Sequence, residues 1–422
     1  MTKLPPQPWI ADPRTQTLLL ALRAAGITAR FVGGCVRDAL LGPSAARESA
    51  DIDLATPSRP EEVVAALEKA GIKVVPSGIA HGTVTAVVSS PGPPRHYEIT
   101  TLRRDVETDG RRARVAFDAD WAEDAARRDF TINAIYLDPD GTLYDPVGGL
   151  ADLDARHVRF VGEAATRIAE DVLRVLRYYR FWARFGSGEG DPAARAACRA
   201  AVPLLPRLSA ERVARELTGL LGAQNPVPSL RLMAEDGVLG AILPEALVAG
   251  AGGLDRLDRL IAMEPEPDRL RRLAALAAFD AEGAARLAGR LRLSGAWRDR
   301  LIGLAPPWPL DPSGDERAQQ HTLYRLGAER YRDLAMLIAA AGGMDGARLG
   351  ELSALAAGWT PPEFPLAGRD VTALGIPPGP RIGQLLGDVR TWWEAGDFTA
   401  DRAACLARLK KIAAIHGYGP PS

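Results

Sequence analysis

The chain has 422 residues, of which 47% are hydrophobic and 25% are charged, and its formal net charge is −1. This length allows about three folded domains, and the composition excludes wholesale disorder. The near-zero net charge excludes a protein-wide basic field, so any surface for nucleic acid must be local.

The cysteines and the apolar runs indicate where the protein works. Cys35, Cys198 and Cys405 are far apart and form no CxxC pair, which predicts a reducing compartment without disulfides or structural zinc. The N-terminus has no apolar run of signal-peptide length, and no later run approaches the roughly 18 apolar residues of a membrane span. We therefore predict a cytoplasmic protein without a membrane segment.

Residues 31–42 have the pattern of a phosphate-binding turn. A predicted strand ends in Gly33 and Gly34, and a short helix is predicted to start near Val36, with Arg37 one turn into it. Glycines at a helix N-terminus let backbone N–H groups approach phosphate closely. An ordinary Gly-Gly turn is the simpler alternative.

The next predicted strand carries Asp51 and Asp53, with one residue between them. Side chains alternate along a strand, so both carboxylates project from the same face. Like charges held close are unfavourable until a divalent cation lies between them, and Mg²⁺ prefers oxygen ligands. The pair therefore predicts a magnesium site for phosphoryl transfer, although an Asp-capped loop would also contain such residues.

The segments GGCVRD at 33–38 and DIDLAT at 51–56 resemble the nucleotidyltransferase superfamily. The resemblance is to its class II branch of tRNA CCA-adding enzymes and bacterial poly(A) polymerases. It implies a mixed-sheet, polymerase beta-like head in which Asp51 and Asp53 bind Mg²⁺. Gly33, Gly34 and Arg37 would then contact the nucleotide.

A helix over 57–70 and two strands over 72–88 are predicted next, followed by a strand in HYEITTLRRD at 96–105. Glu98 lies on this last strand. The resemblance implies that Glu98 completes the metal site and helps to activate the primer. The alternative is a solvent-facing residue of an edge strand.

Residues 103–114, RRDVETDGRRAR, are polar and centred on Gly110. This composition predicts a mobile loop beside the site. In CCA-adding enzymes a flexible loop at this place is associated with the switch from adding C to adding A, so the resemblance makes 103–114 its candidate. A solvated hairpin tip explains the charges equally well.

The segment DAARRDFTINAIYL at 124–137 reads as a helix that delivers Arg127, Arg128 and Asp129 to the start of a strand. Arginines at the mouth of a sheet that bears carboxylates suit a triphosphate clamp. RRDFTINA resembles the second signature of the family, which implies that Arg128 contacts the nucleotide. A surface salt bridge is the alternative.

Residues 166–185, TRIAEDVLRVLRYYRFWARF, predict one helix with Asp171, Arg174 and Arg177 on one side. A solvated face is possible. However, cytosine and adenine both present an amino donor beside a ring-nitrogen acceptor, so an Asp and an Arg would accept C and A and refuse U and G. EDVLR at 170–174 resembles the family's templating motif, which implies that Asp171 and Arg174 select the base. Arg177 and Arg180 would continue the series toward nucleotide and RNA.

The remaining chain is predicted to be helical, with a helix over 208–221, a boundary at 223–229 and a linker at 305–315. PGPRIGQLL at 378–386 places glycines before a helix start, which suits a phosphate backbone. The fold class is thus α+β, with a mixed-sheet head followed by helices only. The predicted domains are a catalytic head (1–160), a neck with the nucleotide-selecting helix (161–222), a body (223–305) and an RNA-binding tail (306–422).

The resemblance implies addition of C, C and A to tRNA 3′ ends from CTP and ATP, with Mg²⁺ as cofactor and no protein partner. Poly(A) polymerase is the nearest alternative, but 77–88 reads SGIAHGTVTAVV in place of a basic-aromatic signature. Enzymes that add only CC or only A stay open. A catalytically silent RNA-binding protein would not need the aspartate pair. No histidine precedes an aspartate, so phosphohydrolase activity is predicted to be absent.

Overall fold

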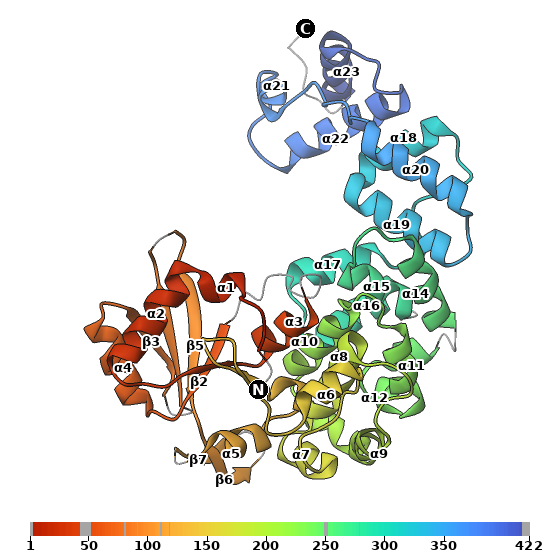
Figure 1. Ribbon diagram of the computed structural model, residues 1–422. Helices are drawn as coiled ribbons and strands as arrows, with labels where there is room; N and C mark the ends of the chain where they lie inside the picture. The colour runs from red at the N-terminus through yellow and green to blue at the C-terminus, as the bar shows by residue number, and fades with distance from the viewer. Residues whose placement is uncertain are drawn as a thin grey trace. The chain divides into compact units, whose positions relative to one another are not determined.

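The computed structural model describes residues 3–42, 52–79, 82–90, 92–109, 112–117, 119–248, 252–277 and 279–415. Figure 1 labels the helices and strands along the chain. The chain divides into two compact units. The first contains Met1–Leu254, Pro267–Arg269 and Arg290–Leu293. The second contains Asp255–Glu266, Leu270–Gly289 and Ser294–Ser422.

A seven-stranded mixed sheet forms the N-terminal part of the first unit, with strand order β3-β4-β5-β2-β1-β8-β9. Only β2 and β5 run parallel among its described pairs. The strands are β1 (Arg30–Val32), β2 (Ile52–Thr56), β3 (Lys73–Gly78), β4 (Thr83–Val88), β5 (Arg95–Thr101), β8 (Tyr136–Leu137) and β9 (Leu143–Tyr144).

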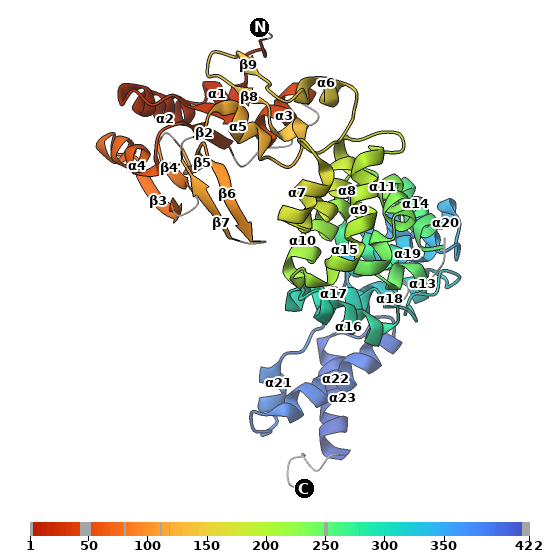
Figure 2. The same cartoon turned by 90° about the horizontal axis from the view of Figure 1, so that it is seen from below.

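One face of this sheet is apolar and covered by helices. Leu54, Ile99 and Val84 are each about 1% exposed there, and α2 (Pro13–Ala24) and α4 (Pro60–Lys69) pack over the strands (Figures 1 and 2). The Thr15 hydroxyl of α2 lies 2.9 Å from the Tyr97 hydroxyl of β5. Since side chains alternate along each strand, the residues between these apolar ones project from the other face.

Shorter elements connect and flank the strands. The hairpin of β6 and β7 forms a separate two-stranded sheet. The remaining elements of this part are α1 (Pro8–Ala11), α3 (Gly34–Leu41), β6 (Arg104–Asp109), β7 (Arg112–Ala116), α5 (Trp121–Ala126), the 3₁₀ turn η2 (Thr131–Asn133) and α6 (Gly149–Asp154).

Helices complete the first unit, and α8 lies at their centre. Buried rings join α8 to the core of the sheet region. Between ring centroids, Phe130 lies 4.9 Å from Phe160 and 5.1 Å from Phe181 of α8. Helices α10 and α11 pack on α8. The helices are α7 (Ala164–Glu170), α8 (Leu173–Phe185), α9 (Pro192–Ala201), η3 (Val202–Arg207), α10 (Ala210–Leu221), α11 (Val227–Glu235), α12 (Val238–Ile242) and α13 (Glu245–Val248).

The second unit is helical throughout its described residues. Its C-terminal helices α21–α23 surround a core that includes Leu385, Trp393 and Leu409. Its helices, of which α14, α15 and α16 extend slightly into the first unit, are α14 (Gly252–Met263), α15 (Arg269–Leu276), α16 (Ala281–Arg290), α17 (Gly295–Gly303), α18 (Glu316–Leu326), α19 (Ala328–Ala340), α20 (Gly346–Gly358), α21 (Gly368–Thr372), α22 (Pro380–Ala395) and α23 (Arg402–Ile415). No described helix is both long and apolar enough to cross a bilayer.

The predicted α+β class with a mixed-sheet head is confirmed. For 103–114 the structure has the hairpin that was the alternative to a mobile loop, since β6 and β7 pair antiparallel. The predicted helix over 166–185 is broken between α7 and α8, at Asp171 and Val172. The division into head, neck, body and tail stays a prediction.

Candidate active site

The glycine turn lies beside a carboxylate. Gly33 follows β1 and has a φ of +79°, and α3 begins at Gly34. A Cβ atom on Gly33 would lie 3.5 Å from Asp53 Oδ2, so the carboxylate of β2 approaches the turn at the start of the helix. Phosphate near the N–H groups of this turn would thus come close to an oxygen ligand for a cation.

Strand register places Glu98 next to Asp53. The two residues are Cα partners in the parallel pair of β2 and β5, and Asp53 also pairs with Val32 of β1. Directly paired residues share a face of the sheet. Glu98 is exposed, whereas its neighbours Tyr97 and Ile99 are buried. The predicted third carboxylate therefore has the register and the exposure that the site requires.

Asp51, the other predicted metal ligand, lies outside the described residues. Among the residues that are described, no group of three acidic, histidine or cysteine side chains gathers closely enough to hold a metal ion. Asp53 and Glu98 thus supply two carboxylates of the predicted set.

A buried aspartate holds two arginines beside the same face of the sheet. The Asp124 carboxylate is 1% exposed and accepts hydrogen bonds from Arg127 Nε (2.8 Å) and Arg128 Nη2 (2.9 Å). The Tyr136 hydroxyl donates to it at 2.7 Å, and Tyr136 pairs with Val32, so it lies in the same row as Asp53. Burial raises the pKa of Asp124, but Arg128 and Arg127 outweigh it and hold the pKa below its usual value.

Arg37 is buried and strongly anchored. It is 5% exposed, and it donates to Asp38 Oδ1 from Nε (2.9 Å) and Nη2 (2.7 Å) and to Asn133 Oδ1 from Nη1 (2.6 Å). Its guanidinium carbon lies 4.1 Å from the Phe185 ring centroid. Burial lowers the pKa of Arg37. The guanidinium is therefore fixed in position, and its hydrogen-bond donors are already bound by protein groups.

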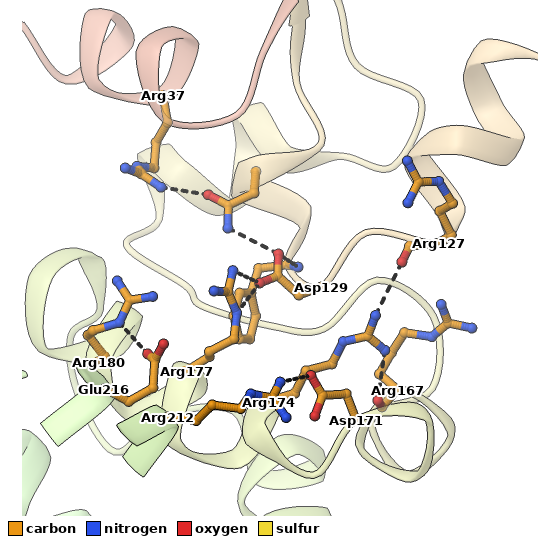
Figure 3. A network of polar contacts seen from close by, with 12 residues as sticks. Arg37, Arg127, Asp129, Arg167, Asp171, Arg174, Arg177, Arg180, Arg212 and Glu216 are labelled. Carbon is orange, nitrogen blue, oxygen red and sulfur yellow. Dashed lines mark hydrogen bonds and ion pairs between the residues drawn. The ribbon is translucent and has the colours of Figure 1, made fainter. Parts of the chain in front are cut away.

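Asp171 occupies the break between α7 and α8. Its Oδ1 accepts the Leu173 backbone N–H at 3.1 Å, and its Oδ2 accepts from Arg212 Nη2 of α10 at 2.6 Å (Figure 3). A carboxylate that binds the backbone two residues ahead competes with a continuous helix and caps a new one. This explains why one helix was predicted wrongly.

Arg174 lies in the first turn of α8, near Asp171. It forms an ion pair with Glu170 and donates to the Arg167 carbonyl at 2.7 Å. Its Nη2 also lies 3.5 Å from the Arg127 carbonyl (Figure 3). The two residues predicted to select the base are thus held close together by different helices and by the end of α5.

The other two arginines of α8 are paired with carboxylates as well. Arg177 Nε donates to Asp129 Oδ2 at 2.8 Å, and Arg180 Nε donates to Glu216 Oε2 at 2.5 Å (Figure 3). Both guanidiniums lie over the Phe181 ring. Charge-assisted bonds and ring contacts restrict their rotamers, so α8 presents an ordered row of positive groups.

Sequence reasoning missed the partners that orient these groups. For Asp124 a local signal exists, because arginines three and four residues later fall on its side of a helix turn. For Arg212 and Glu216, which belong to α10, no local signal exists. The residues that the sequence did not single out are Asp124, Asn133, Glu170, Arg212 and Glu216.

Two family models match the chain. The model described as "Poly A polymerase head domain" matches residues 29–159, and "Probable RNA and SrmB- binding site of polymerase A" matches 191–249. The first match covers the sheet, the glycine turn and the Asp124 cluster. This part of the chain is therefore similar to the head domain of poly(A) polymerases.

Named relatives resemble more of the chain. It is 34% identical over 402 residues to the mitochondrial CCA tRNA nucleotidyltransferase 1 of Danio rerio, covering 90% of this chain and 87% of that protein. It is 39% identical over 247 residues to the CCA-adding enzyme of Geobacillus stearothermophilus, covering 58% of this chain and 56% of that one. The crystal structure of the Bacillus stearothermophilus CCA-adding enzyme in complex with CTP superposes with a TM-score of 0.73 at 29% identity, covering 96% and 99% of the two chains. The chain belongs to the tRNA nucleotidyltransferase family of CCA-adding enzymes.

Proposed function

We propose that this protein adds C, C and A to the 3′ end of tRNA from CTP and ATP without a nucleic-acid template. The observation that carries the proposal is the pairing of Asp53 with Glu98 beside the Gly33 turn. The relatives named as CCA-adding enzymes, and the one solved with CTP, support the choice of substrates.

In this proposal the primer 3′ oxygen attacks the α-phosphate of the nucleotide, and the bond to the β-phosphate oxygen breaks, so that pyrophosphate leaves. Glu98 is exposed beside Asp53 and would orient the primer hydroxyl. Gly33, Gly34 and Arg128 would contact the triphosphate. Arg37 would favour the bound triphosphate through its positive charge and not through a direct hydrogen bond, because its donors already bind Asp38 and Asn133.

The described donors fit a hard divalent cation, since Asp53 and Glu98 offer carboxylate oxygens next to the place for phosphate. Asp53 would hold Mg²⁺ together with Asp51. When bound, Mg²⁺ would offset the negative charge of the attacking and leaving oxygens.

Asp171 and Arg174 would read the base. An acceptor and a donor fork match the amino group and the ring nitrogen shared by cytosine and adenine. Arg177 and Arg180 would extend the contact toward nucleotide and RNA. A cytoplasmic location is predicted from the cysteines alone. The Danio rerio relative, by contrast, is named as a mitochondrial protein.

The test supplies purified protein with Mg²⁺ and a tRNA that lacks its 3′ CCA, with labelled CTP and ATP separately and together. We expect growth by three nucleotides and then a stop, read on a sequencing gel. Asp53→Asn should lose this activity, whereas Thr100→Val, on the same sheet face, should keep it. An untemplated ladder of A would instead identify a poly(A) polymerase, and growth by two nucleotides or one would identify divided labour.

A further inference from the structure

A continuous chain of polar side chains joins the glycine helix α3 to α8. Arg37 Nη1 donates to Asn133 Oδ1 at 2.6 Å, and Asn133 Nδ2 donates to Asp129 Oδ1 at 3.1 Å. Asp129 Oδ2 then accepts two hydrogen bonds from Arg177. We call Arg37, Asn133, Asp129 and Arg177 the amide bridge. Arg37, Asp129 and Arg177 appear in Figure 3.

The charges on either side fix the orientation of the Asn133 amide. A cation faces its oxygen and a carboxylate faces its nitrogen, so the reversed amide would place like partial charges against both neighbours. An amide is the side chain of this size that offers an acceptor on one side and a donor on the other. Asn133 thus satisfies two ions of opposite charge at once.

Burial makes these bonds costly to lose. Asn133 is 7% exposed and Arg37 is 5% exposed, so water has little access to replace a missing partner. Asp129 is held further by the Phe130 backbone N–H at 2.8 Å. Arg177 is the most exposed member, with 32% of its side chain accessible. The bridge therefore runs from a buried anchor to a partly open guanidinium on α8.

We propose that Asn133 is a positioning residue for nucleotide binding, which acts by holding Asp129 so that Arg177 points to the nucleotide. The proposal rests on the proposed function, in which Arg177 contacts the nucleotide. Through Arg37 the same amide ties α8 to the helix that follows the Gly33 turn. The triphosphate side and the base-selecting side of the site are thereby assembled before the nucleotide arrives.

The experiment measures the dissociation constant of CTP in the presence of Mg²⁺ by isothermal titration calorimetry. Asn133→Ala removes both hydrogen bonds, whereas Asn133→Asp keeps the side-chain size and the bond to Arg37 but repels Asp129. We expect both variants to bind CTP about 10-fold to 100-fold more weakly, the range for loss of a hydrogen bond to a charged group. Asn133→Asp serves as the test in a folded protein if the alanine variant unfolds.

The matched control is Tyr179→Phe, which removes another buried side-chain hydrogen bond of α8, from Tyr179 to Asp236 at 2.7 Å. It should lower the thermal unfolding temperature without weakening CTP binding. A double-mutant cycle with Arg177→Ala then tests the route of action. In that background we expect Asn133→Ala to have no further effect on the dissociation constant.

Additive effects in the cycle, or unchanged CTP binding by both Asn133 variants, would overturn the proposal. A wild-type protein that binds CTP but does not extend tRNA would overturn the proposed function alone, because the cycle still reports on Asn133. A wild-type protein that binds neither CTP nor ATP would overturn both.

Discussion

Gly33 has a backbone conformation that other residues rarely adopt, and it has a close neighbour. Its φ of +79° lies in the left-handed region, and Asp53 Oδ2 lies 3.5 Å from the place of a Cβ atom. Gly42, at the other end of α3, has a φ of +91° and no atom within 4 Å of that place. The two glycines share the backbone requirement, but only Gly33 adjoins the carboxylate.

Gly33→Ala and Gly42→Ala should therefore separate backbone strain from an effect on the site. Both should lower the free energy of unfolding by about 1–2 kcal/mol, the cost of a left-handed conformation for a residue with a Cβ. Only Gly33→Ala should also slow nucleotide addition, by about 10-fold or more, because its methyl group lies between the turn and Asp53. Urea denaturation and single-turnover kinetics would measure the two effects. Equal rates in the two variants would contradict this role of Gly33.

At the scale of elements, the end of α5 is organised by one buried carboxylate. Asp124 binds Arg127, Arg128 and Tyr136, so it ties the helix end to β8. Its pKa in the folded protein lies below the usual value, since the arginines outweigh the effect of burial. A carboxylate with a depressed folded pKa contributes stability that is complete above its unfolded pKa of about 3.9 and is lost as the pH falls through the folded pKa.

The unfolding free energy of the wild-type protein should thus decrease as the pH falls below about 4. Asp124→Asn should make this decrease at low pH smaller. At pH 7 the substitution should lower the free energy of unfolding by about 1–3 kcal/mol, because two arginines lose an ionised acceptor. Urea denaturation between pH 3 and pH 7 measures both. Glu123→Gln, an exposed change on the same helix that keeps its capping group, is the control. If the free energy of unfolding falls with pH as steeply in Asp124→Asn as in the wild-type protein, this account is contradicted.

At the scale of the whole molecule, buried ion pairs occur in both compact units. The second contains a buried ionic network: Glu264, whose side chain is 2% exposed, pairs with Arg272 at 2.5 Å and with Arg271 at 2.8 Å. Arg271 also pairs with Asp333 at 2.8 Å. Charges this deeply buried depend on each other, since a missing partner leaves an ion without solvation.

Glu264→Ala should consequently destabilise the second unit by about 3–5 kcal/mol, the range for breaking a buried ion pair. Differential scanning calorimetry would detect the change as a lower unfolding temperature. The control is Glu282→Ala, which breaks the exposed pair between Glu282 and Arg286 and should change stability little. Similar effects of the two substitutions would show that burial does not determine the cost.

Much of the chain could be predicted from local pattern. Helix α4 follows from Pro60, the early glutamates and the apolar period. The turn between β1 and α3 follows from Gly33 and Gly34. These features depend on neighbouring residues, so the sequence was sufficient for single elements, the helical remainder and the order of the motifs. The mixed-sheet head was implied by the family resemblance that those motifs carry.

Other features were decided only by contacts between distant residues. The register that sets Asp53 beside Glu98 arises from two strands paired across the sheet. The second oxygen of Asp171 is bound by Arg212, which lies 41 residues later, whereas its bond to the Leu173 N–H at the helix break is local. A local pattern indicates backbone propensity and the period at which residues are buried. It does not indicate which buried charge pairs with which partner. The sequence by itself thus determined the elements and the candidate residues, whereas tertiary packing determined how those residues are oriented, because ion pairs and strand registers form between segments that fold onto each other.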